Sequence, residues 1–89
     1  MTTSEQHERY QQYVKNALAE VLERDAGELS LSATFADQGL DSLLGLRFAG
    51  KLGDVLGVEV ELEWLMDYPS IAQLAHFLDG RVALQNPIS

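Results

Sequence analysis

Apolar residues recur at helical spacing in three separate segments, and this periodicity limits the fold of the chain more than any other sequence feature. A spacing of three or four residues places apolar side chains on one face of a helix. Similar stripes run from Ser42 to about Leu56 and from about Ile71 to Leu78. The first segment, from about Glu5 to Arg24, carries Tyr10, Val14, Ala17, Leu18, Val21 and Leu22 at such positions.

Residues that favour helix ends lie beside these segments. Gly27 is a plausible C-terminal cap for the first helix. Asp41 is a good N-cap for the second helix, which Gly57 is expected to end. Ser70 can cap the last helix, and Gly80 is expected to terminate it.

A fourth, short helix is expected between the second and the last. Val58, Val60 and Leu62 alternate as in a strand, but a lone strand would have no partner in such a helical chain. We therefore expect a loop that leads into a short helix near Glu61 to Met66. The predicted fold class is all-α, a small four-helix bundle of three main helices and a short third helix.

The length of the chain allows one small domain. The chain has 89 residues, 46% hydrophobic and 22% charged, which is globular composition. We expect a flexible N-terminal segment at residues 1–9, a domain at 10–80, and a tail or linker at 81–89. This tail favours a domain excised from a longer protein over a free-standing one.

The charge and the absence of cysteine narrow the function classes. Acidic residues outnumber basic ones 14 to 6, giving a formal charge of −8, so nucleic acid and anionic membranes are poor partners. The chain has no cysteine, which excludes disulfides, thiolate metal sites and a cysteine nucleophile. The acids also lack the spacing of a calcium loop, so no metal site is expected. The sequence has neither a membrane-length apolar run nor a signal-peptide core, and predicts a cytoplasmic monomer.

The acidic residues concentrate in the middle and the C-terminal half of the chain. From Leu52 to Gly80 there is no basic residue at all. Two interpretations stay open: a solvated surface that keeps a small domain soluble, or a docking surface for a basic partner.

A long connection at residues 28 to 40 precedes the second helix. Connections of this length are uncommon in small domains and tend to be functional. This one contains four apolar residues, Leu29, Leu31, Phe35 and Leu40. We expect Leu31 and Phe35 to pin it to the core.

The second helix carries more apolar residues than one buried face needs. Its core-facing stripe is expected to consist of Leu44, Phe48, Leu52, Val55 and Leu56. Leu43 and Leu46 fall on another face, together with Arg47 and Gly50. An apolar patch beside an exposed helix start indicates a contact surface. The alternative is that Leu43 or Leu46 covers the long connection.

Ser42 stands in the first turn of this helix. A catalytic serine needs a base and an orienting group, and Ser42 also lacks the second glycine of a Gly-x-Ser-x-Gly elbow. A phosphate ester on Ser42 would lie at the positive end of the helix, near free backbone N–H groups. Asp41 would repel it, so only a covalent bond would hold a phosphate there.

The residues around Ser42 resemble a known family. The segment Gly39-Leu40-Asp41-Ser42-Leu43 resembles the attachment motif of acyl carrier proteins, especially the carrier domains of polyketide synthases. Phe35 resembles the aromatic residue that precedes this motif. Residues 51–58 resemble the helix end and turn that follow it. Residues 66–75 resemble the family's Phe-Asp-Tyr-Pro-Thr-x-x-x-Leu-Ala segment. The matches keep the family's order and spacing over most of the chain.

The resemblance implies a cofactor and a set of partners. A phosphopantetheinyl transferase would move 4′-phosphopantetheine from coenzyme A onto Ser42, with Asp41 and Leu43 as flanking motif residues. The thiol of this arm would hold an acyl group as a thioester, and the carrier itself would catalyse nothing. Ketosynthase, acyltransferase and other polyketide synthase enzymes or domains would be its partners.

One residue on the exposed face departs from the family pattern. Arg47 stands where many relatives have glutamate, and with Lys51 it could meet an acidic partner site. The alternative is a solvated pair in which Asp54 balances Lys51. Trp64 is expected to be a core or interface aromatic residue. The predicted docking surface comprises Leu43, Leu46, Arg47, Gly50, Lys51, Glu61 and Glu63.

Two other functions stay open at this point. A peptidyl carrier domain of a nonribosomal peptide synthetase would share the fold, the arm and the serine. Such domains usually show Gly-Gly-His-Ser-Leu at the attachment site, whereas here Asp41 precedes Ser42. A helical interaction domain without an arm would use the same acidic surface and apolar patch.

Overall fold

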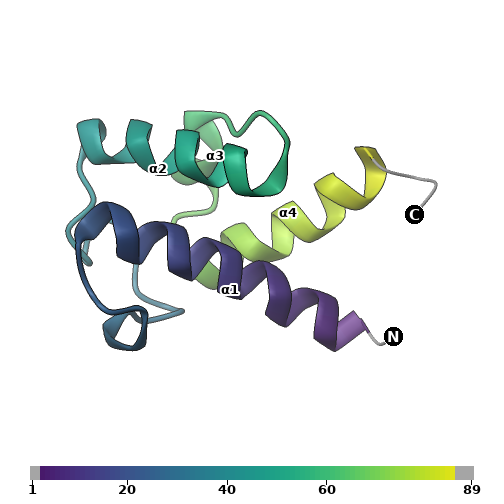
Figure 1. Ribbon diagram of the computed structural model, residues 1–89, viewed down its shortest axis with the longest axis horizontal. Helices are drawn as coiled ribbons and strands as arrows, with labels where there is room; N and C mark the ends of the chain where they lie inside the picture. Colours follow the sequence, from purple (N-terminus) through teal and green to yellow (C-terminus); the bar gives the residue numbers. More distant parts are fainter. Residues whose placement is uncertain (1–2, 86–89) are drawn as a thin grey trace.

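The computed structural model describes residues 3–85, with side chains from residue 8 to residue 81. No strand occurs among these residues, and the predicted all-α class is confirmed. The helices, labelled in Figure 1, are α1 (Thr3–Leu22), α2 (Ser42–Leu56), α3 (Leu62–Asp67) and α4 (Ile71–Gln85), with a short 3₁₀ helix at Ala26–Glu28. None of the described helices is long and apolar enough to cross a membrane.

The core lies where three long helices meet. α1 packs against both α4 and α2, and α3 packs on α2 (Figure 1). Complete burial of an aliphatic or aromatic side chain contributes about 1.5–3 kcal/mol, so a few such residues dominate the stability of a small domain. The largest fully buried side chains are Phe48, Leu18, Leu52, Ile71, Leu74, Leu78 and Val14, which come from the three predicted stripes.

Local caps fix both ends of α2, as predicted. The Asp41 carboxylate accepts a hydrogen bond of 2.8 Å from the N–H of Leu44. At the other end, Gly57 takes a left-handed conformation with φ 71°, which glycine adopts without strain. Ser70 likewise caps α4, since its hydroxyl accepts from the N–H of Gln73 at 3.2 Å.

The end of α1 differs from the prediction. The helix ends at Leu22, and Glu23, not Gly27, takes the left-handed conformation, with φ 58°. The N–H of Arg24 donates to the carbonyl of Ala19 at 2.9 Å, which is the closing bond of a Schellman motif. Gly27 instead lies within the 3₁₀ helix. The expected glycine cap is wrong because the chain turns earlier, on a residue type that rarely adopts this conformation.

The end of α4 also differs. The helix continues through Gly80 to Gln85, so the expected stop at Gly80 is wrong. Gly80 does not adopt a positive φ, and the good helix formers after it carry the helix onward. Helix therefore covers residues 3–9 and 81–85, where a flexible segment and a tail were expected. The domain boundaries stay predictions, and residues 1–2 and 86–89 lie outside the described residues.

The long connection is anchored to the start of α4. The N–H of Phe35 donates to the carbonyl of Pro69 at 2.7 Å, and the N–H of Ala72 donates to the carbonyl of Leu31 at 3.0 Å. The ring of Phe35 is buried and meets Phe48 edge-on, with 5.3 Å between ring centroids. Leu31, however, is 37% exposed, which contradicts its expected core position. Its backbone makes the contact with α4, and Leu29 fills the core instead.

The side chain of Gln38 ties the connection to itself. Its Oε1 accepts from the N–H of Ser30 at 2.8 Å. Its Nε2 donates to the carbonyls of Ser30 at 3.0 Å and Ala33 at 3.3 Å. These bonds satisfy backbone groups that no helix or sheet would satisfy, so the segment before Ser42 is ordered without regular secondary structure.

Candidate functional site

Ser42 is the first residue of α2, and its side chain is exposed. Asp41 satisfies the N–H of Leu44 through its carboxylate and that of Gly45 through its carbonyl, at 2.7 Å. The N–H groups of Ser42 and Leu43 have no acceptor within the described part of the chain. The positive end of the helix dipole and two free donors therefore lie beside the Ser42 hydroxyl.

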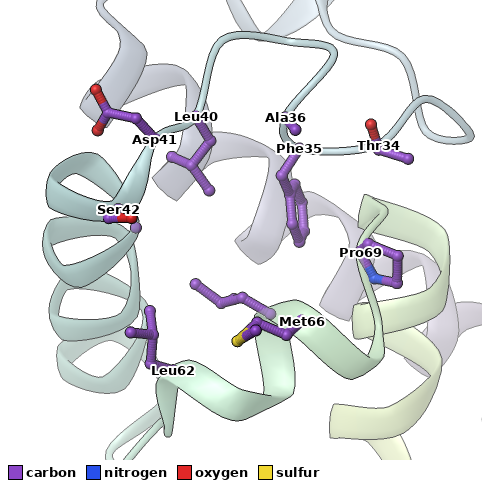
Figure 2. Close-up of a pocket in the computed structure, with 11 residues that line it drawn as sticks. Thr34, Phe35, Ala36, Leu40, Asp41, Ser42, Leu62, Met66 and Pro69 are labelled. Carbon is purple, nitrogen blue, oxygen red and sulfur yellow. The ribbon is translucent and has the colours of Figure 1, made fainter.

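An apolar cavity of about 390 Å³ opens beside Ser42. Figure 2 shows it between α2, α3 and the connection, with the Phe35 ring and Leu40 pointing into it from above. Gly45 contributes no side chain to the α2 wall, where a Cβ would come within 3.5 Å of Leu62. Met66 borders the cavity from α3 and is 76% exposed. Neither this cavity nor the exposure of Met66 could be read from the sequence, because four separate segments build them.

No described side chain is placed to activate Ser42 as a nucleophile. The Asp41 carboxylate bonds the Leu44 N–H and points away from Ser42 (Figure 2). His76 lies elsewhere, on α4, where it borders a separate cavity with Tyr68 and Phe77. The described residues also include no group of three histidines and acids that could hold a metal ion. The arrangement lacks the base and orienting group of a serine hydrolase and suits Ser42 as an acceptor of a group transferred by another protein.

The exposed face of α2 contains four of the predicted docking residues. Leu43 is 64% exposed and Leu46 57%, so neither covers the connection. Arg47 and Gly50 are exposed beside them. Large apolar side chains this exposed at a helix start indicate a contact surface.

The opposite, core-facing stripe of α2 differs from the prediction in two residues. Leu44 is only half-buried and lies outside the core cluster. Val55 is 50% exposed, whereas Gly45 and Ala49 are buried. The side of α2 that carries the small residues Gly45 and Ala49 faces inward, because α3 packs closely against it. The nearness of Gly45 to Leu62 shows this packing. The helix is therefore rotated slightly relative to the expected stripe.

The remaining docking predictions fall in different surroundings. Lys51 forms an ion pair with Glu20 of α1, not with Asp54 as considered from the sequence. The two residues are 31 positions apart, so no local spacing could reveal the pair. Glu61 precedes α3 and Glu63 lies in its first turn, both exposed.

Trp64 belongs to the core, which is one of the two positions, core or interface, predicted for it. The residue is 7% exposed, and its ring meets Phe77 edge-on, with 5.0 Å between ring centroids. The guanidinium of Arg81 lies over it, 5.3 Å from the ring centroid. This cluster fixes α3 against α4, and the described residues that line the cavity beside Ser42 include none of α4.

Curated relatives of the chain are polyketide synthases. It is 31% identical over 83 residues, 92% of its length, to the erythronolide synthase EryA2 of Saccharopolyspora erythraea. It is 42% identical over 52 residues, 58% of its length, to the non-reducing polyketide synthase VdtA of Byssochlamys spectabilis. The chain spans only about 2% of the length of either relative.

Solved structures with the same fold are carrier proteins. A free-standing peptidyl carrier protein of Acinetobacter baumannii superposes with a TM-score of 0.80 at 26% identity, covering 85% of this chain and 95% of that one. The HMG-ACPI domain of the CurA module of Lyngbya majuscula gives a TM-score of 0.77 at 26% identity, covering 85% of this chain and 77% of that one. The predicted four-helix carrier fold is confirmed.

The family model of the phosphopantetheine attachment site matches residues 12–78, which include Ser42 and both flanking motif residues. This family carries covalently attached 4′-phosphopantetheine. The exposed hydroxyl at an open helix start fits such a group, because the two free N–H groups can face the oxygens of a phosphodiester. The resemblance inferred from the motifs is thereby confirmed, and the chain belongs to the phosphopantetheine attachment-site family of carrier domains.

Proposed function

We propose that this chain is an acyl carrier domain of polyketide biosynthesis, with 4′-phosphopantetheine attached to the hydroxyl of Ser42. The observation that carries the proposal is the placement of Ser42. It is exposed, it begins a capped helix, and it stands in the Gly-Leu-Asp-Ser-Leu segment within the matched residues. The polyketide synthases among its relatives support the acyl class of cargo.

The residues of the chain hold and present the arm. The N–H groups of Ser42 and Leu43 would hold a phosphodiester on Ser42, a helix-end effect of about 0.3–1 kcal/mol when exposed. Asp41 opposes it by like-charge repulsion, so the covalent bond provides the attachment. The arm supplies a terminal thiol that carries an acyl group as a thioester. The chain itself is non-catalytic and acts by keeping this group at high effective concentration near its partners.

The proposed partners are a phosphopantetheinyl transferase and the ketosynthase, acyltransferase and other domains of a polyketide synthase. The proposed docking surface comprises seven residues of α2 and the beginning of α3. All are exposed except Lys51, which is half-buried and paired with Glu20. They are Leu43, Leu46, Arg47, Gly50, Lys51, Glu61 and Glu63. A monomeric state and a cytoplasmic location stay predictions from the sequence.

The test is the intact mass of the protein before and after incubation with coenzyme A and a promiscuous phosphopantetheinyl transferase. The native protein is expected to gain one phosphopantetheine. Ser42→Ala is expected to keep its circular dichroism spectrum and to gain nothing, because the exposed hydroxyl makes no hydrogen bond with a described residue. An unmodified native protein with an active transferase would favour an interaction domain without an arm.

A peptidyl carrier of a nonribosomal peptide synthetase is the second candidate, because a peptidyl carrier protein superposes so well on this chain. Both candidates share the serine and the arm, so phosphopantetheine loading does not separate them. Loading by an acyltransferase with malonyl or methylmalonyl groups, against loading by an adenylation domain with amino acids, does. We expect the acyl groups to load, and loading by amino acids alone would reverse the assignment.

A further inference from the structure

One cation stands alone on the exposed face of α2. Arg47 is exposed and has no ion pair or hydrogen bond with any described residue. Lys51, one helical turn later, is held by Glu20 of α1. The two bases on this helix, which seem equivalent in the sequence, therefore differ: one is neutralised within the fold and the other is available to a partner.

The surroundings of Arg47 are apolar and open. Leu43 lies one turn before it, and Leu46 lies next to it in the chain, each more than half exposed. Gly50 lies three residues after Arg47, and nothing stands within 4 Å of the place where its Cβ would be. A partner can therefore approach the guanidinium closely. The apolar surface around Arg47 would be desolvated by that contact.

The two edges of this face differ in charge. Arg47 lies on the side of Lys51, whose ammonium reaches α1. The opposite side of α2 carries Gly45, whose Cβ would lie 3.5 Å from Leu62, and packs on α3. On and beside α3 the exposed charged residues are all acidic: Glu59, Glu61, Glu63 and Asp67. Around the first turns of α2 the face thus runs from an acidic edge at α3, across the Leu43–Leu46 ridge, to the single cation Arg47. Asp54 is exposed on the same side of α2, but two turns further along the helix.

We propose that this polarity selects a partner protein surface with the reverse order: a carboxylate opposite Arg47, an apolar seat for Leu43 and Leu46, and a basic group opposite α3. The inference rests on the proposed carrier function and names the partner chemistry of its docking surface. A guanidinium offers a planar, two-pronged donor that matches a carboxylate, and two charge contacts of opposite sign fix the orientation of docking. A polyanion such as nucleic acid does not fit, since the acids of α3 and the net charge of −8 repel it.

The test is the affinity of the full chain for the purified ketosynthase domain of its own synthase. The Kd is measured by NMR titration of the carrier, once with the arm attached and once without it. Arg47→Glu is expected to raise the Kd about tenfold or more, because attraction becomes repulsion at a charge contact. Arg47→Lys is expected to give a smaller loss, since it keeps the charge but not the planar fork. Arg9→Glu makes the same charge change at an exposed position of α1 and is the matched control. Its Kd is expected to stay within about twofold of the native value.

Replacing the ketosynthase acidic residue that lies opposite Arg47 by arginine is expected to restore binding to the Arg47→Glu carrier. The same replacement is expected to weaken binding to the native carrier. Equal affinities of the native carrier and Arg47→Glu, including no binding by either, would overturn the proposal. So would equal losses in Arg47→Glu and Arg9→Glu. The intact mass of every variant is also recorded after incubation with coenzyme A and the transferase. Failure of the carrier function appears in this mass, separately from the binding of the unloaded protein.

Discussion

Asp41 stabilises the start of α2 through one hydrogen bond to the N–H of Leu44. Asp41→Ala is expected to lower the free energy of unfolding by about 1 kcal/mol, the usual effect of losing an N-cap. Asp41→Asn should lose much less, because an amide oxygen can accept the same bond. Urea denaturation of the three proteins measures the difference. Equal losses in both variants would mean that the charge of Asp41, and not its hydrogen bond, stabilises the helix start.

Tyr10 gives the fold a dependence on alkaline pH. Burial raises the pKa of Tyr10, and the negative charge of Asp79 and the neighbouring Tyr13 raise it further, against a smaller lowering by Arg9. Its stabilising contribution is therefore complete below pH 10, the ordinary pKa, and is lost as the pH rises through the higher pKa of the folded state.

Tyr10→Phe removes this contribution. The difference in unfolding free energy between the native protein and Tyr10→Phe is expected to be constant from about pH 7 to 9 and to shift in favour of Tyr10→Phe above about pH 10. Urea unfolding at several pH values measures it. A difference that stays constant up to about pH 11.5 would show that the folded state does not resist ionisation of Tyr10.

Alanine substitutions at two glycines of α2 allow the effect of helix propensity on stability to be measured apart from the effect of packing. Nothing lies near the missing Cβ of Gly50, whereas a Cβ on Gly53 would come within 2.8 Å of the carbonyl oxygen of Val58. Gly50→Ala is expected to stabilise the protein by about 0.5–1 kcal/mol, as alanine is the better helix former. Gly53→Ala should destabilise it, because the turn after α2 must move. Thermal unfolding of both variants tests this, and a Tm shift of the same sign in both would refute the packing argument.

Helix ends with local signals could be predicted from the sequence, and the others could not. The limits of α2 follow from Asp41 and Gly57, whose side chain and conformational freedom act within a few residues. The end of α1 depends on Glu23 adopting a conformation that its residue type does not announce. The continuation of α4 through Gly80 depends on the residues that follow, which outweigh one glycine.

For the molecule as a whole, α3 is expected to be the least stable of the α-helices. It has only six residues, most of them exposed, and its buried anchors are Trp64 and Leu65. We expect the amides of α3 to exchange with solvent at least about tenfold faster than the central amides of α1 and α4. Native-state hydrogen exchange followed by NMR measures these rates. Equal protection in all helices would show that α3 opens only when the whole domain unfolds.

More of the proposed attachment site than of its surroundings could be predicted from the sequence. Ser42, Asp41 and the exposure of Leu43 and Leu46 follow from local pattern and from a motif of contiguous residues. The pairing of Lys51 with Glu20 and the cavity beside Ser42 depend on segments far apart in the chain. A single sequence indicates which helix face is apolar, but not which neighbour neutralises a charge on it.

For the proposed carrier, the bonds of Gln38 have a consequence for the exchange of partners. They close the connection on itself in the free protein, so the backbone before Ser42 is already ordered. Ordering one residue costs about 1–2 kcal/mol in conformational entropy, and here folding has met that cost before any partner arrives. Docking and release then require no ordering or disordering of this loop. A carrier built this way can dock weakly over a small area and still present its serine in one position at every encounter.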